Sequence, residues 1–398
     1  MTTAISESKT AQRLNLVVTF IGFLDTPLLV PVVALYAASL GAEVAVIGLI
    51  VGVYSLTNTV ISIVGGRLVD RYGYKVPLVA GLVGDSLGMF GYGLCRLPWH
   101  LGLVRAFHGA SGGLVGPATM SATAQTSSRK TLGRGMALYG IAIGSATLIG
   151  NATGGLIATR LGYPYVFVIG GSLLAIAVVL SILLPKAAAR SVEKPDLTTQ
   201  LARIIRMLTN RKLRLPYASI FAQYFAFGGI VTLLPLRAES LGLSAFHVGI
   251  LIAAFALVFI LVQLPAGSLS DRIGRARPAT IGLGIAAVAV AALPIFGALS
   301  LMLMVMALFG LGYGLFFPSL SALVADNTSQ EEYGTASGIY HALLTVGVAV
   351  GAPIMGWVAT YAGTSLGLAL SSVPLFAALV LAVKTLSRKA HVAELKQT

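Results

Sequence analysis

The sequence predicts an all-α integral membrane protein, with twelve transmembrane helices in two six-helix parallel-repeat bundles and both termini in the cytoplasm. Three observations predict this fold class: an apolar composition, twelve runs long enough to span a bilayer, and a repeat that relates the two halves. Of the 398 residues, 57% are hydrophobic and only 10% are charged, whereas soluble domains carry about 25% charged residues. A chain of this composition needs a bilayer around it.

The apolar runs are each close to the roughly 20 residues that a helix needs to cross a bilayer. Glycine is spread through them, as expected where helix backbones approach closely in lipid. Because their number is even, both termini should lie on the same side of the membrane. The runs fall near residues 14–37, 45–65, 76–96, 99–122, 135–158, 164–185, 215–236, 246–266, 278–297, 299–323, 335–359 and 366–385.

The lysines and arginines predict the orientation. If the N-terminus is inside, all but four of the 27 lie in inner segments; the exceptions are Arg96, Arg160 and Arg237 in outer segments and Arg105 within a helix. Cytoplasmic loops carry the excess of basic residues, so both termini are expected in the cytoplasm. The basic residues behind the net charge of +14 are thus explained by the orientation of the chain in the membrane, and we expect no nucleic-acid partner.

One long polar segment, residues 186–214, separates the two halves. Within it, LARIIRML has helical spacing and basic residues, which suits a helix on the inner membrane surface. The predicted domains are a cytoplasmic tail (1–13), an N-terminal bundle (14–185), a cytoplasmic linker (186–214), a C-terminal bundle (215–385) and a second cytoplasmic tail (386–398).

The two halves repeat with a constant offset of 201 residues. GRLVDRYG at 66–73 matches GSLSDRIG at 267–274, and the same offset pairs Gly109 with Gly310 and Pro117 with Pro318. Two six-helix halves in parallel repeat are the arrangement of one large class of transporters, in which the substrate site lies between the halves near the bilayer midplane.

The loop between the second and third predicted helices carries the most specific motif, Gly66-Arg67-Leu68-Val69-Asp70-Arg71-Tyr72-Gly73-Tyr74-Lys75. With it, essentially the whole chain resembles the major facilitator superfamily, whose loop reads roughly G-x-L-a-D-R-x-G-R-K; Tyr74 stands where a second arginine is usual. Glycine permits a tight turn there. The resemblance implies a cytoplasmic gate that holds the outward-open state, formed by Gly66, Asp70, Arg71, Gly73, Lys75, Gly267, Asp271, Arg272 and Gly274.

Further motifs place the resemblance closest to the proton-driven drug-efflux branch of twelve-helix antiporters. The first helix, FLDTPLLVPVVALYAASLGA, is similar to the opening of that branch. LVRAFHGASGG is similar to the R-x-x-Q-G-x-G motif of the whole family; it keeps Arg105 and Gly109, with His108 in place of glutamine. In the fifth helix Asn151 replaces the proline of G-P-x-x-G-G. This departure weakens the antiporter interpretation and leaves the transporter interpretation unchanged.

Asp25 and Asp85 are the only acids within the predicted helices. An ionised carboxylate in an apolar helix costs several kcal/mol unless a partner compensates it. In a core of about 30 Å, Asp25 and Arg105 should lie at depths that differ by roughly 5 Å, so they could meet directly or through water. We expect a proton-coupling group formed by Asp25, Arg105, Asp85 and His108. A permanent structural Asp25–Arg105 pair is the alternative, and structural roles stay open for Asp85 and His108.

A substrate pocket is expected from polar and aromatic residues on helices that line the central cavity of this fold. A mostly apolar cavity with a few amides and hydroxyls suits an amphipathic organic solute. The expected residues are Tyr36, Tyr54, Asn58, Asn151, Gln223, Tyr224, Phe227, Gln263, Tyr313, Phe317, Tyr340 and His341.

Two functions fit these residues: proton-coupled efflux of a drug or metabolite, and proton-coupled uptake of a small metabolite such as a carboxylate or sugar. A membrane sensor or scaffold is disfavoured because the loops leave no room for an output domain. No cluster of nucleophile, base and orienting group and no metal-ligand spacing appears, so we expect no enzyme, no metal and no cofactor. The expected partners are a small-molecule substrate, protons and the lipid bilayer of a bacterial inner membrane, with the chain acting as a monomer.

Overall fold

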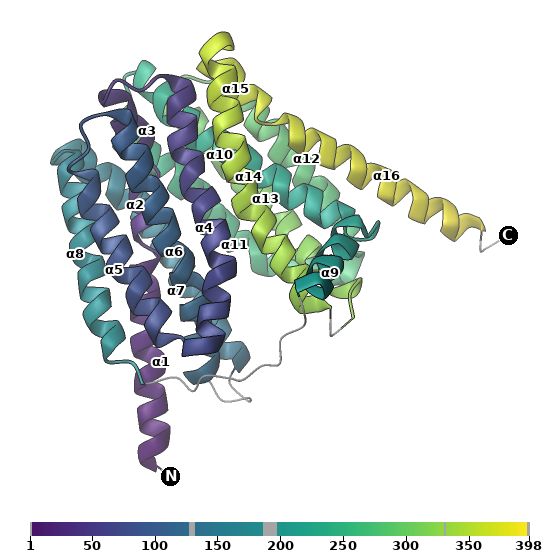
Figure 1. Ribbon diagram of the computed structural model, residues 1–398. Coiled ribbons are helices and arrows are strands. Elements are labelled where there is room, and N and C mark those ends of the chain that lie inside the picture. Colours follow the sequence, from purple (N-terminus) through teal and green to yellow (C-terminus); the bar gives the residue numbers. More distant parts are fainter. Residues whose placement is uncertain (1, 127–131, 186–196, 330–331, 396–398) are drawn as a thin grey trace. The chain divides into compact units, whose positions relative to one another are not determined.

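The computed structural model describes residues 2–126, 132–185, 197–329 and 332–395, which form helices joined by short turns (Figure 1). No β-strand occurs among these described residues, so the all-helical fold predicted from the sequence is confirmed for them. The chain divides into two compact units. Unit 1 comprises residues 1–193 and 238–253, and unit 2 comprises residues 194–237 and 254–398. Of the predicted linker, residues 186–196 lie outside the described part.

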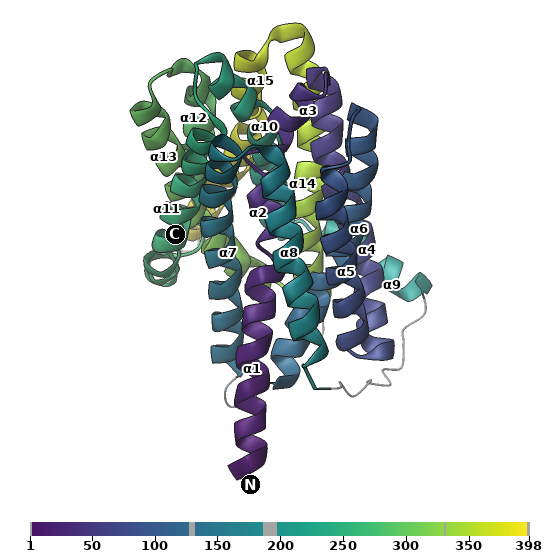
Figure 2. The same ribbon diagram turned by 90° about the vertical axis from the view of Figure 1, so that its left-hand side faces the viewer.

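Unit 1 is built around α5, which packs between α6 and α8, while α6 also packs along α4 (Figure 1). Helix α1 contacts α6, α7 and α8, and α2 contacts α7 (Figure 2). Its helices are α1 (Thr2–Gly22), α2 (Asp25–Leu29), α3 (Val33–Ser39), α4 (Val44–Tyr72), α5 (Lys75–Tyr92), α6 (Pro98–Thr126), α7 (Leu132–Arg160) and α8 (Tyr163–Ile182).

Unit 2 repeats this pattern, with α12 packed against α13 and α16. The segment LARIIRML is helical as predicted and belongs to α9. The end of α10 (238–240) and the beginning of α11 (245–253) belong to unit 1. The elements are α9 (Leu197–Thr209), α10 (Arg214–Ser240), α11 (Ala245–Ile273), α12 (Ala276–Ala292), the short 3₁₀ turn η1 (Leu293–Ile295), α13 (Leu299–Asp326), α14 (Tyr333–Ala362), α15 (Thr364–Leu370) and α16 (Val373–Leu395).

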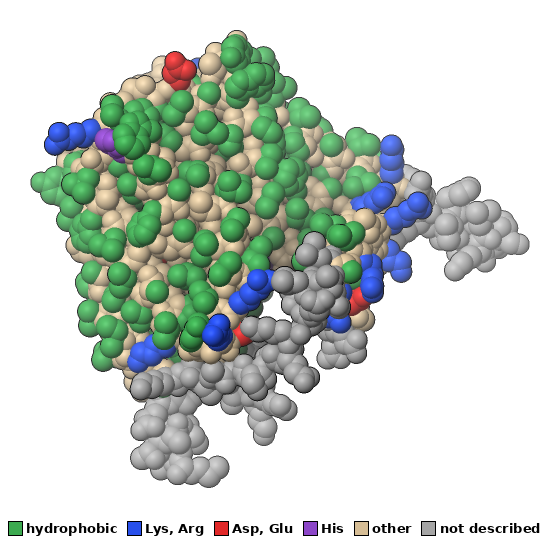
Figure 3. Space-filling view, in the orientation of Figure 1, with side chains coloured by type: hydrophobic (Ala, Val, Ile, Leu, Met, Phe, Trp, Pro, Cys, Tyr) green, Lys and Arg blue, Asp and Glu red, His purple; other side chains and the backbone are tan. Residues whose placement is uncertain are grey.

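By length and composition, nine helices of the described part could cross a membrane, or ten if one bent pair counts as a single span. The twelve predicted ranges all fall on helical segments, but α5 and α6, which carry the buried Asp85, Arg105 and His108, are not among these nine. The outer surface is strongly apolar: Leu264 is 85% exposed and Leu261 is 65% exposed. In Figure 3 hydrophobic side chains cover the middle of the visible face, while Lys and Arg lie toward its margins. Such a surface suits contact with lipid.

The first predicted span, residues 14–37, is not one continuous helix. It is divided into α1, α2 and α3, and α3 is bent by 45° from the preceding segment. Proline has no N–H for the helical hydrogen bond to the residue four positions earlier, so Pro27 leaves the carbonyl of Phe23 without that partner and Pro31 does the same to Pro27. The prolines therefore break the helix on both sides of α2, and Asp25 lies in its first turn.

The segment expected as a gate loop is also mostly helical. Residues 66–72 form the last two turns of α4, and residues 267–273 end α11 in the same way. The turn begins only at Gly73, with φ of 76°, and at Gly274, with φ of 87°, a backbone region open mainly to glycine. Gly66, which was expected to permit the turn, is an ordinary helical residue with open space where a Cβ would be.

Backbone geometry confirms the internal repeat. The six described glycines with positive φ form three pairs separated by 201 residues: Gly41 and Gly242, Gly73 and Gly274, and Gly162 and Gly363. Close helix contacts repeat as well, because a Cβ at Gly109 would collide with the carbonyl oxygen of Tyr54, and one at Gly310 with that of Phe255. The two units thus use the same turns and the same close approach of helices.

Candidate functional site

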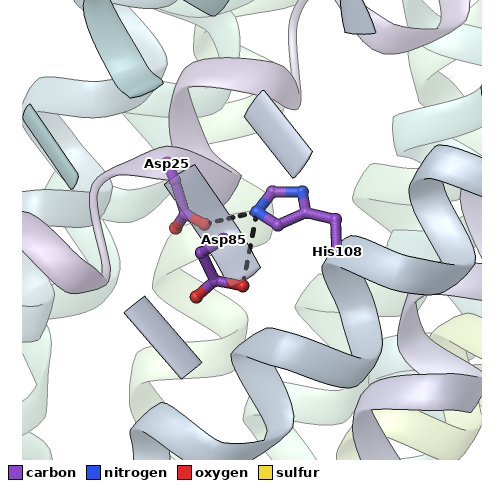
Figure 4. A group of neighbouring side chains, drawn as sticks. All are labelled: Asp25, Asp85 and His108. Atoms are coloured by element: carbon purple, nitrogen blue, oxygen red, sulfur yellow. Dashed lines mark hydrogen bonds and ion pairs between the residues drawn. The ribbon is translucent and has the colours of Figure 1, made fainter. Parts of the chain in front are cut away.

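A buried charged cluster lies in unit 1, where the break in the first span brings Asp25 toward α6. The carboxylate Oδ2 of Asp25 is 2.7 Å from Nε2 of His108 (Figure 4), and the two residues are 3% and 0% exposed. The residues are 83 positions apart in the chain. An imidazole and a carboxylate at this distance share a proton in a hydrogen bond that is strengthened when the imidazole is charged.

His108 is held from its other side by a residue that the sequence reasoning missed. Its Nδ1 is 2.9 Å from the hydroxyl group of Tyr92, the last residue of α5. The absence of a side chain at Gly88 leaves room for the ring, since a Cβ there would lie 3.1 Å from Cβ of His108. With both nitrogens engaged, the imidazole has a fixed orientation, and Asp25, His108 and Tyr92 form a continuous hydrogen-bonded chain.

Asp85 completes the cluster from α5. Its Oδ1 is 3.8 Å from Nε2 of His108 (Figure 4), and the residue is 1% exposed. Neither carboxylate oxygen has a hydrogen-bond partner among the described residues. A buried, unpartnered carboxyl group is costly, so Asp85 is the least satisfied member of the cluster. Its side chain thus lies next to His108 of α6.

Of the two contacts expected between Asp25 and Arg105, direct or through water, no direct one occurs among the described residues. The guanidinium of Arg105 lies over the ring of Tyr54, 4.5 Å from the centroid, and its Nε and Nη1 have no hydrogen-bond partner among the described residues. The reason is that His108, one helical turn further along α6, forms the hydrogen bond with the Asp25 carboxylate instead. Tyr54 connects the two regions: its ring also contacts His108, and its hydroxyl is 2.7 Å from that of Thr26.

Two of the four substrate residues expected in unit 1, Tyr36 and Asn151, form hydrogen bonds away from the charged cluster. Tyr36 donates from its hydroxyl to the carbonyl oxygens of Tyr92 and Cys95, so it ties α3 to the end of α5. Asn151 donates to the carbonyl of Thr147 in its own helix, and its Oδ1 is unpaired in the described part. Only Tyr54 and Asn58 lie beside the charged cluster, where a Cβ at Gly112 would approach both side chains and Asp85.

The aromatic residues expected in unit 2 do come together. Tyr313 stacks on Phe259 at 4.3 Å, donates from its hydroxyl to that of Tyr224 at 3.1 Å, and contacts Phe317. Phe227 and Tyr340 extend the same cluster through ring contacts with Tyr224, Phe255 and Phe317. Three members of the cluster were missed: Phe259, and Phe255 and Phe309, whose rings stack at 4.7 Å. They could have been found by applying the offset of 201 to Asn58, Tyr54 and His108.

The remaining polar residues of unit 2 are less tightly placed. Gln223 is buried on α10, and neither of its amide atoms has a partner in the described part of the chain. Gln263 on α11 is half-buried, and His341 on α14 is exposed next to Tyr340. Their predicted role in substrate binding stays a prediction.

The two predicted gate segments are stabilised differently. In unit 1, Tyr74 and Lys75 donate to the carbonyls of Pro185 and Leu184 just beyond α8, at 2.8 and 2.7 Å, where a cation also compensates a helix C-terminus. In unit 2, Arg275 stands at the position equivalent to Tyr74. It pairs with Asp271 and, at 3.3 Å, with Asp326; the hydrogen bond to Asp271 raises the pKa of Arg275.

Comparison with known proteins agrees with this architecture. The family model described as Major Facilitator Superfamily matches residues 16–236 and 216–397. An uncharacterized MFS-type transporter of Methanocaldococcus jannaschii is 25% identical over 350 residues, 87% of this chain and 90% of that protein. A multi-drug resistance efflux pump PmrA homolog of Lactococcus lactis is 26% identical over 372 residues, 88% and 91% of the two chains.

Solved structures show the same fold at lower identity. The crystal structure of the nucleoside transporter NupG superposes with a TM-score of 0.78 at 16% identity, covering 94% of this chain and 98% of that one.

Proposed function

The chain belongs to the major facilitator superfamily, and we propose that it is a secondary active transporter that exports a small amphipathic organic solute in exchange for protons by alternating access. The observation that carries this proposal is the buried Asp25–His108 pair, 2.7 Å apart. Both groups can gain and lose a proton, and both are shielded from water by the helices of unit 1. Ionisable groups at such depth in a membrane protein are typical of proton pathways.

The hydrogen-bonded chain suggests how the proton is held. A proton on Asp25 or on Nε2 of His108 lies between the two groups, and Tyr92 stabilises either tautomer because its hydroxyl can donate or accept. Arg105, held against Tyr54, supplies a positive charge near the cluster. Binding and release of the proton therefore change the charge of a buried site, which gives the two conformational states of a carrier different energies.

Export of an amphipathic solute is supported by the aromatic cluster of unit 2 and by relatives. Stacked rings with three hydroxyl groups offer an apolar surface with a few polar contacts, as small-molecule sites usually do. The Lactococcus lactis relative is named as a multidrug efflux pump. We further propose twelve spans, cytoplasmic termini, a monomer, and residence in a bacterial inner membrane. The distribution of Lys and Arg supports the cytoplasmic termini.

Proton-coupled uptake of a small metabolite such as a carboxylate or sugar is the second candidate. Arg105 favours it, because a buried guanidinium with unpartnered Nε and Nη1 could receive a substrate carboxylate in a bidentate pair. Asn151, in place of the proline usual in antiporters, points the same way.

Reconstituted protein with a pH-sensitive dye in the lumen separates these directions. An antiporter in acid-loaded vesicles releases lumenal protons when an amphipathic cation is added outside, whereas a symporter carries protons inward together with its solute. Asp25→Asn should abolish the coupled flux. Glu239→Gln, which removes an exposed carboxylate, is the matched control and should not. Normal flux and pH dependence in Asp25→Asn would refute a proton-carrying role for Asp25.

A further inference from the structure

Three ligand atoms converge in unit 1 from three different helices. Asp25 on α2, Asp85 on α5 and His108 on α6 each offer one carboxylate oxygen or ring nitrogen, and all three atoms lie within 4.8 Å of one another (Figure 4). We infer that these side chains bind a single divalent transition-metal ion. The inference goes beyond the proposed function, since proton-coupled export requires no metal and a metal site requires no export.

Asp85 provides the independent reason to expect a ligand. Both of its carboxylate oxygens lack a hydrogen-bond partner in the described part of the chain, although the residue is 1% exposed. Its Oδ1 points toward Nε2 of His108 at 3.8 Å. Buried charges in proteins are either paired or coordinate metals, and the direction of this carboxylate leads to the two other ligand atoms.

The donor set selects the class of ion. Two carboxylates and one imidazole suit Mn²⁺, Fe²⁺, Co²⁺ or Zn²⁺, whereas Mg²⁺ and Ca²⁺ prefer oxygen ligands throughout. The only cysteine, Cys95, directs its Sγ to the carbonyl of Gly91, so no thiolate joins the cluster. Bonds of about 2.0–2.2 Å require the present Asp25–His108 contact to open slightly around the ion while Asp85 moves closer.

The surroundings of His108 match those of a metal-binding histidine. Ligating imidazoles usually engage their second nitrogen with another protein group, which fixes the ring. The hydroxyl of Tyr92 does this at Nδ1, 2.9 Å away, and thereby leaves Nε2 facing the two carboxylates.

Arg105 is a fixed positive charge close to the cluster and should therefore weaken the binding of a metal cation there. Its guanidinium lies on the ring of Tyr54, and that ring contacts His108. A cation at the cluster is repelled by Arg105, so removal of the arginine charge should tighten metal binding. A merely structural contribution of Arg105 would change affinity in the opposite direction or not at all.

The test measures Co²⁺ binding to the full-length protein in detergent, by calorimetry and by the visible absorption of Co²⁺. The protein is treated with chelator and purified through a tag without histidine, with Cys95→Ser as background. We expect one ion per chain, at least about 10-fold weaker binding for Asp85→Asn, retained binding for Asp85→Glu, and tighter binding for Arg105→Gln. His247→Gln, which removes a histidine bonded to Ser244, should bind as the parent does.

Failure of the parent protein to bind Co²⁺, or unchanged affinity in both Asp85→Asn and His108→Gln, would overturn the inference. Thermal melting without metal shows whether each variant is folded, and the two substitutions affect different helices. The outcome is separate from that of the flux experiment. Proton-coupled export without metal binding refutes only the metal site, and metal binding without proton exchange refutes only the proposed function.

Discussion

The two units have the same backbone plan and opposite side-chain chemistry at equivalent positions. In unit 1, α4, α5 and α6 enclose a cluster of charges, whereas in unit 2, α11, α12 and α13 enclose aromatic and aliphatic side chains. With the offset of 201, the replacements are Asp25 by Ala226, Asp85 by Ala286, Arg105 by Met306, His108 by Phe309, Tyr54 by Phe255 and Asn58 by Phe259.

This difference shows that the scaffold does not dictate what its interior contains. The close approach of α4 to α6 at Gly109 and of α11 to α13 at Gly310 is the same, and so are the turns at the glycines with positive φ. Backbone contacts set by glycine therefore preserve the repeat while the side chains between them specialise. In the proposed function, unit 1 holds the coupling proton and unit 2 offers an apolar surface to the solute.

Exchange of one residue between the units should have the largest effect. His108→Phe, which installs the residue of unit 2, removes the partner of Asp25 and leaves both carboxyl groups without the imidazole. We expect loss of proton-coupled flux and destabilisation by about 3–5 kcal/mol, as for other broken buried ion pairs. Flux in proteoliposomes and unfolding in SDS titrations measure the two effects.

The reciprocal change, Phe309→His, is the control for that exchange. Phe309 is 1% exposed and stacks on Phe255, so an imidazole there has no comparable partner and should cost about 1–3 kcal/mol. It should leave the pH dependence of transport unchanged. A shifted pH dependence in Phe309→His would show that the two units are functionally more alike than their side chains indicate.

Gly109→Ala and Gly310→Ala test the shared scaffold. Each added Cβ would meet a backbone carbonyl of the facing helix, and overpacking of this kind costs about 1–3 kcal/mol. Because the contacts repeat, the two variants should lose similar stability, as measured by SDS titration. Gly140→Ala and Gly338→Ala, where a Cβ has open space, should be neutral or slightly stabilising. Strongly unequal losses at Gly109 and Gly310 would contradict a common scaffold.

Two tyrosines distinguish the roles of the polar and the aromatic cluster. Tyr313→Phe removes the hydrogen bond to Tyr224 and should cost about 0.5–1.5 kcal/mol, with unchanged pH dependence of transport. Tyr54→Phe removes a shorter hydrogen bond, 2.7 Å, to Thr26. Because Tyr54 also lies between Arg105 and His108, this change should shift that pH dependence as well. Profiles of flux against pH for the two variants decide this, and identical profiles would argue against separate roles.

The smallest effect is expected at the gate segment of unit 2. Arg275→Ala removes ion pairs with Asp271 and Asp326, which are 66% and 51% exposed, and such pairs contribute about 0.2–1 kcal/mol. The loss, measured as a shift of the melting temperature, should shrink in high salt because exposed charges are screened. A loss that is independent of salt would show that packing of the Arg275 stem matters more than its charge.

Particular residues show how far prediction from sequence reached. The apolar runs predicted helices at every range, and the matching motifs at 66–73 and 267–274 predicted the repeat. Two predictions from the sequence were wrong about local backbone structure. The apolar run at 14–37 looked continuous, but Pro27 and Pro31 divide it into three helices. Gly66 was expected in a turn, but it lies within α4. The sequence reasoning also placed Arg105 near Asp25 from their depths in the membrane alone. Depth does not specify which face of α6 is turned toward Asp25, and that face carries His108.

The sequence by itself determined that this chain is an apolar, helical, twofold-repeated protein of the major facilitator superfamily, because hydrophobicity, glycine positions and motif spacing are local properties of the chain. Only the tertiary structure decided the composition of the buried cluster. Asp25, Asp85, Tyr92 and His108 come from separate helices, and their distances depend on the break before α2 and on the packing of α5 against α6. A helix rotated by one residue would present a different face, so no pattern along the chain could have placed His108, rather than Arg105, beside the aspartate.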